Sequence, residues 1–189
     1  MTHARPRTLL AAAGLALAAC ASSGGKYTDR NMDFGAIKAV AVMPFANLSR
    51  DNLAGDRVRD VFANALLATE AIYVVPTGEV ARAAGRIGIP NLVAPTNEEV
   101  TKLGQQLKVE AVITGVVKEY GEVRSGSAVS NVVSMSVQMQ ETATGKVVWS
   151  ASTTKGGVNF GDRLLGGGGT PLNPVTEAAV DDLLNKLFK

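Results

Sequence analysis

Two apolar runs rich in β-branched residues constrain the fold of this chain more than any other feature. Residues 37–45 (IKAVAVMPF) and 111–117 (AVITGVV) are almost continuously apolar. A strand with one wet face would alternate polar and apolar residues, whereas such runs are typical of central strands that are covered on both faces. The sequence therefore predicts a sheet with helices packed on both sides.

Helical periodicity fills the segments between and after these runs. Val58, Phe62 and Leu66 recur at the spacing of one helix face. Thr77 is expected to cap a brief helix, and Thr96 with Glu99 forms a capping box that opens another. A terminal helix is expected to begin at Asn173-Pro174, an N-cap followed by proline, and to continue through residue 187.

The remaining strands are predicted from period-two alternation. Residues 129–140 alternate valine and methionine with serine and glutamine, and a Thr144-Gly145 turn leads into residues 147–151. Residues 73–76 form one more short strand. The order is β-α-β-α-α-β-β-β-α, and we expect a single α/β sandwich domain with a mixed β-sheet over residues 37–189.

The first twenty residues predict export and lipid attachment. Arg5 and Arg7 precede an apolar run, residues 9–19, which is too short to span a bilayer as a helix. The run ends in a lipobox, formed by Leu17, Ala18, Ala19 and Cys20. We expect a signal peptide over residues 1–19, cleavage before Cys20, a diacylglycerol on its thiol and an acyl chain on its new amino group.

Two alternatives remain for this segment: an ordinary secretory signal, or an N-terminal helix that stays on the chain.

Residues 20–36 are small and polar at their start, and they are expected to form a lipidated flexible linker. Ala21 follows Cys20. Lipoproteins that resemble this chain are usually kept at the inner membrane by an aspartate there, so we expect attachment to the outer membrane, facing the periplasm.

Composition excludes several kinds of chemistry. His3 is the only histidine and would leave with the signal, and Cys20 would be blocked as a thioether. Serine and cysteine nucleophiles paired with histidine, and the common zinc sites, are therefore excluded. Removing Arg5 and Arg7 leaves 17 basic residues against 17 acidic ones. We expect no nucleic-acid partner, no metal, no small-molecule substrate and no cofactor beyond the lipid on Cys20.

A carboxylate-based cell-wall enzyme is a further alternative. Asp51, Asp56 and Asp60 could form a catalytic cluster, since glycosidases use two carboxylates. Arg57 and Arg59 are interleaved with them, however, so an exposed charged helix face is the preferred interpretation. The glycine run at residues 166–169 lacks the lysine of a phosphate-binding loop.

Three separated segments carry a resemblance to known proteins. Residues 40–49 (VAVMPFANLS), 109–115 (VEAVITG) and 142–150 (TATGKVVWS) occur in the same order and spacing in a group of bacterial envelope lipoproteins. This group includes the curli-secretion lipoprotein CsgG, the penicillin-binding-protein activator LpoB and relatives of the TolB amino-terminal domain. The resemblance covers residues 37–188 and implies the α/β fold of that group.

The same resemblance implies a non-enzymatic, outer-membrane-anchored accessory or scaffold protein in envelope assembly or secretion. Its partners would be other envelope proteins or copies of itself. A ring-forming, CsgG-like export subunit is the alternative, although only the hairpin at residues 129–152 resembles a membrane-inserting segment. The predicted linker is too short for the long reach through peptidoglycan of LpoB-like proteins.

Two loops are candidate contact surfaces, chosen by position and composition. The first spans residues 86–95 and includes Arg86 and Asn91. The second spans residues 156–170 and includes Phe160 and Arg163. Conspicuous polar loops on a rigid scaffold often bind partners.

Overall fold

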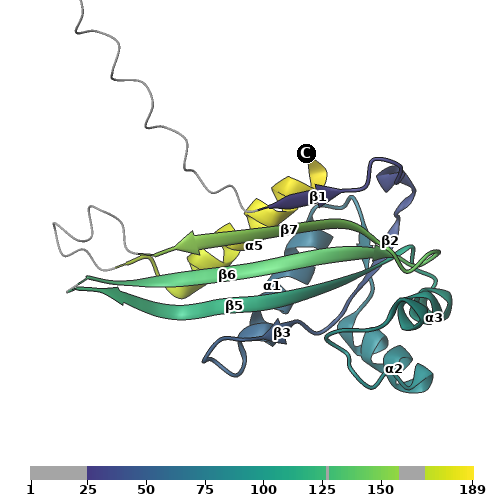
Figure 1. The fold of residues 1–189 in the computed structure, drawn as a ribbon, viewed down its shortest axis with the longest axis horizontal. Helices are drawn as coiled ribbons and strands as arrows, with labels where there is room; N and C mark the ends of the chain where they lie inside the picture. Colours follow the sequence, from purple (N-terminus) through teal and green to yellow (C-terminus); the bar gives the residue numbers. More distant parts are fainter. Residues whose placement is uncertain (1–24, 127, 158–168) are drawn as a thin grey trace, which may run out of the picture.

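The computed structural model describes residues 25–126, 128–157 and 169–189. Its centre is a seven-stranded mixed sheet in the order β1-β7-β6-β5-β2-β4, with β3 beside β5 (Figure 1). The strands are β1 (Lys26–Thr28), β2 (Ala39–Val42), β3 (Ala46–Asn47), β4 (Tyr73–Val74), β5 (Ala111–Ser125), β6 (Ala128–Glu141) and β7 (Val147–Gly156). Pairing is parallel from β4 through β2 to β5, and antiparallel from β5 to β1. The predicted α/β class with a mixed sheet is confirmed.

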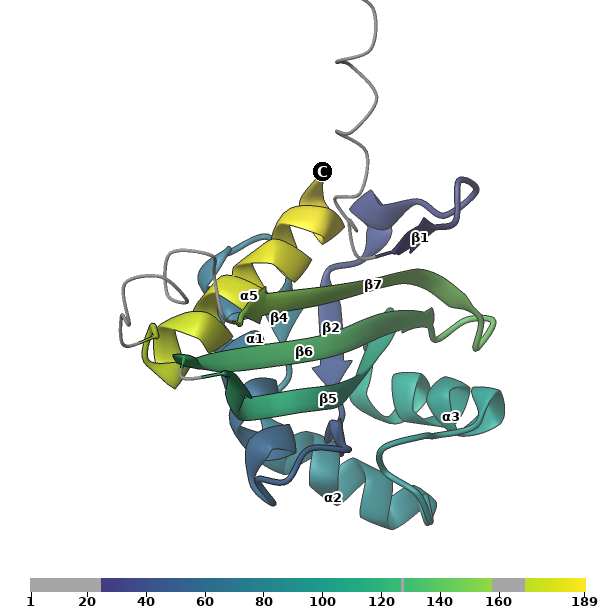
Figure 2. The same ribbon diagram turned by 60° about the vertical axis from the view of Figure 1, so that its left-hand side comes forward.

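Helices lie on both faces of the sheet. α1 (Ala54–Ala68) and α5 (Leu172–Phe188) pack on one face, where they share a core with β2, β5, β6 and β7. α2 (Thr77–Ile87) and α3 (Asn97–Leu107) pack on the other face, against β2 and the start of β5. Figure 2 shows α2 and α3 grouped at the end of the molecule opposite the C-terminus. The second face is therefore only partly covered.

The predicted helix stripes are confirmed, but two predicted caps are wrong. Val58, Phe62 and Leu66 are fully buried, and the Thr96–Glu99 capping box forms as expected. Thr77 is instead the first residue of α2, after Pro76 at the N-cap. α5 begins at Leu172, which places Asn173 and Pro174 inside its first turn. Proline is tolerated there because the first-turn N–H groups have no helical partner.

Regular secondary structure is present earlier in the chain than the sequence predicted. β1 pairs with β7 in the register Lys26↔Ala151, and a short 3₁₀ helix, η1 (Phe34–Ala36), follows it. Phe34 packs against the core that α1 and α5 share. The expected flexible linker over residues 20–36 is therefore wrong from Lys26 onward. Three polar residues become a strand because β7 offers them an edge to pair with.

β5 is also longer than expected. The apolar run predicted a strand over residues 111–117, but β5 continues to Ser125 and pairs with β6 to the end of the hairpin. A β-bulge between Val117 and Glu119 shifts the register where the charged residues begin. Pairing with the long β6 extends the strand beyond its apolar part.

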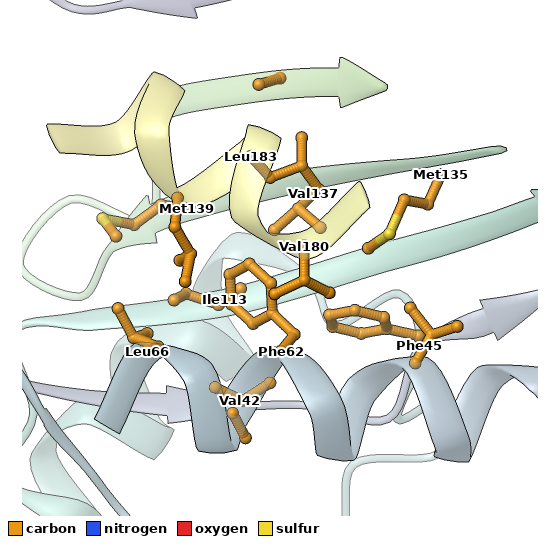
Figure 3. Close-up of a cluster of buried hydrophobic side chains, with 14 of the residues drawn as sticks. Val42, Phe45, Phe62, Leu66, Ile113, Met135, Val137, Met139, Val180 and Leu183 are labelled. Carbon is orange, nitrogen blue, oxygen red and sulfur yellow. The ribbon is translucent and has the colours of Figure 1, made fainter. Parts of the chain in front are cut away.

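One aromatic side chain, Phe45, contacts both α1 and the sheet in the core that α1 and α5 share. Phe45 follows β2, is buried, and lies 5.9 Å from Phe62 between ring centroids. Figure 3 shows these two rings side by side, with Val180 and Leu183 of α5 in the same cluster. A Cβ atom built on Gly115 would lie 2.9 Å from ring atoms of Phe45, and one on Gly55 would lie 2.7 Å from its carbonyl oxygen. Only glycine allows this close approach of α1, β5 and Phe45.

Gly115→Ala is therefore expected to destabilise the domain by about 1–3 kcal/mol, because the added methyl overpacks the Phe45 ring. The matched control is Gly85→Ala on the exposed side of α2, where nothing lies within 4 Å of the added atom. That control should be neutral or stabilising by up to about 1 kcal/mol. Urea unfolding of wild type and the two variants measures both changes. Equal stability of wild type and Gly115→Ala would contradict the close packing of the Phe45 ring on Gly115.

A partly buried ionic cluster fastens α5 to β7. Asp182 accepts hydrogen bonds from Lys155 Nζ at 2.9 Å and Lys186 Nζ at 2.6 Å. Lys186 Nζ also donates to the Ser152 carbonyl at 3.0 Å, and the indole of Trp149 donates to the Lys186 carbonyl at 3.4 Å. Burial raises the pKa of Asp182, but hydrogen bonds from Lys186, Lys155 and Thr153 outweigh it and lower this pKa to about 2. The ionised carboxylate is the form that holds the cluster together.

The pH dependence of stability follows from this lowered pKa. The contribution of Asp182 is complete above its unfolded pKa of about 4 and is lost as pH falls through about 2. Asp182→Asn should cost about 1–2 kcal/mol at pH 7, allowing for solvent screening at a partly exposed site. Thermal unfolding should show this difference shrinking between pH 4 and pH 2. Asp181→Asn makes the same change on the exposed neighbour and is the matched control, and a constant difference for Asp182→Asn would contradict the assignment.

Candidate partner-binding surface

The predicted loop at residues 86–95 is held in place by its ends. α2 stops at Gly88, whose φ of 77° lies in the left-handed region, and Gly88 N–H donates to the Ala84 carbonyl at 3.0 Å. Ile89 is buried and anchors the chain against α2 and α3. Arg86 and Asn91 are exposed, and the Asn91 Oδ1 accepts from the Val93 N–H at 3.3 Å. The predicted loop is therefore wrong at its start: Arg86 lies in the last turn of α2, and of the two predicted residues only Asn91 is on the loop.

A polar sheet face lies beside this loop. Val133, Met135, Val137 and Met139 point into the core, so Ser134, Ser136 and Gln138 occupy the opposite face of β6. Register places Ser150, Ser152 and Thr154 of β7 directly beside them, and the Ser134 and Thr154 hydroxyls lie 2.9 Å apart. Among the described residues, no helix packs over this stretch of β6 and β7. In Figure 1 these strands lie in front of α1 and α5, which turns the open face toward the reader.

The loop and the open face meet in a shallow hollow of about 400 Å³. Val93, Ala94 and Pro95 supply its rim, and Thr114, Ser136, Gln138 and Ser150 are among the residues of its floor. We call this set the loop-and-sheet surface. Its hydroxyl and amide groups can both donate and accept hydrogen bonds, and its described lining contains no ionisable side chain. Such a neutral surface suits a protein partner that offers backbone or amide groups.

The sites with a shifted pKa lie elsewhere and have structural roles. Glu110 Oε2 accepts the N–H groups of Lys38 at 3.0 Å and Ala39 at 2.8 Å, where β2 begins. Burial raises the pKa of Glu110, but these backbone hydrogen bonds lower it below its ordinary value. Glu110 thus fastens the start of β2 to β5, in the same way that Asp182 fastens α5 to β7.

The carboxylates considered for catalysis pair with neighbouring arginines. Arg59 contacts Asp60 at 2.7 Å and Asp56 at 3.5 Å, and Arg57 contacts Asp51 at 2.9 Å. The side chains of Asp56 and Asp60 are more than half exposed. This arrangement fits the exposed charged helix face that was the preferred interpretation of the sequence. The Arg59 guanidinium contacts both Asp56 and Asp60, the two carboxylates that a catalytic pair would use.

Several predicted residues lie outside the described ranges. These are the lipobox residues Leu17, Ala18 and Ala19, the attachment residue Cys20, and the loop residues Phe160 and Arg163. The lipid attachment and the second candidate loop therefore stay predictions. In the described part of the chain, no helix combines the length and apolarity that crossing a membrane requires.

A second exposed feature, which the sequence pattern did not predict, is the turn between β3 and α1. Leu48 is 71% exposed and Leu53 is 54% exposed. Asn47 Nδ2 donates to the Asp51 carbonyl at 2.7 Å, and Asp51 Oδ1 accepts from the Leu53 N–H at 2.9 Å, so the turn is internally braced. The sequence signal that could have indicated this turn is the pair Leu48 and Leu53, which lie outside the apolar stripe of α1. Leu48 borders a hollow of about 490 Å³ beside the extended part of β5.

Comparison with known proteins shows the fold. No protein family model matches the chain, and no curated protein sequence matches it. Among solved structures, a PelC dodecamer from Paraburkholderia phytofirmans matches with a TM-score of 0.57 and 16% identity, covering 87% of this chain and 97% of that one. The lipoprotein GNA1162 from Neisseria meningitidis matches with a TM-score of 0.55 and 23% identity, covering 78% and 99%.

A third structure belongs to the group that the sequence resembles. The LpoB C-terminal domain from Salmonella enterica matches with a TM-score of 0.50 and 13% identity, covering 67% of this chain and 86% of that one. The resemblance to LpoB is therefore confirmed at the level of fold, and the resemblance to CsgG and TolB stays a prediction. The chain shares its fold with the lipoprotein GNA1162 and with the LpoB and PelC structures.

Proposed function

We propose that this protein is a lipoprotein of the outer membrane that faces the periplasm and acts, without catalysis, by binding other envelope proteins. The lipobox that ends in Cys20 is the observation that carries the proposal. The fold supports it, because the LpoB C-terminal domain and the lipoprotein GNA1162 have the same fold. Fold alone does not assign a task, so the partner has to be identified by experiment.

The mechanism is tethering combined with a preformed contact surface. A lipid on Cys20 would confine the domain to one leaflet and raise its effective concentration near other anchored proteins. The loop-and-sheet surface is rigid on both sides, since α2, α3 and the sheet hold its parts. Little ordering is needed on binding, which favours affinity from a modest contact area.

A ring-forming export subunit is the second candidate function. The structure from Paraburkholderia phytofirmans that shares this fold is described as a dodecamer. Closed rings arise when one patch of each copy contacts a different patch of the next. In such a ring the loop-and-sheet surface would contact another copy of the same chain.

Capture of the native lipidated protein from its own membranes separates these functions. The accessory function predicts recovery with one or two discrete envelope proteins, and Cys20→Ala should lose both membrane attachment and most of that recovery. Sizing of the detergent-extracted eluate is the second readout. A large homo-oligomer with nothing else bound would refute the accessory function and support the ring.

Gln138→Lys tests the loop-and-sheet surface directly. The exposed Gln138 can become lysine without loss of folding, but a partner would then bury an unpaired charge, and recovery should fall about tenfold or more. Gln105→Lys, on the exposed face of α3, makes the same change away from the surface and should keep full recovery. Equal recovery of both variants at unchanged thermal stability would rule out this surface.

A further inference from the structure

The place where the folded domain begins restricts how it can lie on a membrane. Gly25 is already fixed, because its carbonyl accepts the Ser152 N–H at 3.1 Å, and β1 follows at once. Only residues 21–24 separate Gly25 from Cys20. An extended chain advances at most about 3.6 Å per residue, so the Cα atoms of Cys20 and Gly25 lie within about 18 Å of each other.

We infer that the end of the domain formed by β1, η1 and the last turn of α5 rests on the lipid surface. This inference rests on the proposed lipid attachment at Cys20. If Cys20 carries acyl chains, the start of β1 must lie close to the leaflet that holds them. Figures 1 and 2 both place β1 beside the C-terminal end of α5, with α2 far from both. We call this end the β1–α5 end.

The side chains at the β1–α5 end fit a membrane interface. Phe188 is 47% exposed and Tyr27 is 50% exposed. Phe34, Leu187 and Phe188 border one apolar hollow of about 220 Å³ between η1 and α5. Aromatic side chains are enriched at the level of lipid headgroups, where an apolar ring and a polar edge are both accommodated.

The charges at this end are compatible with an anionic headgroup layer. Lys26, Arg30 and Lys38 are exposed there. The carboxylates of Asp29 and Asp33 lie beside them and brace local turns, since Asp29 Oδ1 accepts from the Asn31 N–H and Asp33 Oδ1 from the Gly35 N–H, both at 2.9 Å. Basic residues near an anionic membrane surface contribute about 1 kcal/mol each. The β1–α5 end thus combines exposed rings with three exposed basic side chains.

This orientation leaves the loop-and-sheet surface accessible. Gln138 and Ser136 lie on the open face of β6, and the rim at residues 93–95 comes just before α3. A protein partner would therefore approach along the membrane or from the periplasmic side, without displacing lipid.

Site-specific quenching tests the inference in the full lipidated chain. Its native cysteine is consumed by the lipid, so an introduced cysteine can be labelled alone with a nitrobenzoxadiazole fluorophore. Ala36→Cys places the label in η1, and Ala81→Cys places it on α2. Both alanines are exposed, so the two variants are matched. The vesicles contain phosphatidylethanolamine, phosphatidylglycerol and a lipid with a nitroxide near its headgroup.

The label at residue 36 should lose about half or more of its fluorescence, because an interfacial site lies within about 10 Å of the headgroup boundary. The label at residue 81 should keep its fluorescence. Equal quenching at both sites, or none at residue 36, in protein that floats with the vesicles would overturn the orientation and leave the lipid attachment standing. Failure of the wild-type protein to float, matching a Cys20→Ala control, would instead overturn the proposed function.

Discussion

The contact of Phe45 with two glycines is the constraint on which the rest of the structure depends. Its ring lies against Gly115 of β5, its carbonyl lies against Gly55 of α1, and Phe62 packs beside it. Burying such a ring contributes about 1.5–3 kcal/mol, and the close contacts of Phe45 also set positions. It fixes the distance between α1 and the sheet, and the braced turn that carries Leu48 leaves the core immediately after it.

The other two segments that carry the resemblance also join elements that are distant in sequence. Glu110 binds the first N–H groups of β2, and Thr142 Oγ1 donates to the Val109 carbonyl at 2.7 Å while its side chain packs on Gly104 of α3. All three segments therefore specify how strands and helices meet. None lies mainly on the loop-and-sheet surface, which explains why the sequence resemblance extends to the fold and leaves the task open.

Local patterns predicted the elements whose own residues decide their structure. The buried runs of β2 and β5, the stripe of α1 and the alternation of β6 could all be read from the sequence, because burial imposes a period on them. β1 has only three polar residues and depends on β7, and the outer half of β5 depends on β6. For the surface, Arg86, Asn91 and the polar side of β6 were visible in the sequence. The hollow itself joins residues 93–95 to the polar side of β6 and contains neither Arg86 nor Asn91, and this contact depends on tertiary packing, which no local period encodes.

The order of pairing in the sheet has a consequence for how this chain would fold during the proposed export. β1 is the first strand in the sequence, and its described partner is β7, which lies near the far end of the chain. A chain that emerges amino-terminus first thus exposes residues 26–28 long before residues 149–151 arrive. Pairings across such a separation form late, since the intervening loop must close first. The strand nearest the expected lipid site would thus be among the last to join the sheet, and lipid transfer to Cys20 could proceed on a chain whose neighbouring residues are still accessible to enzymes.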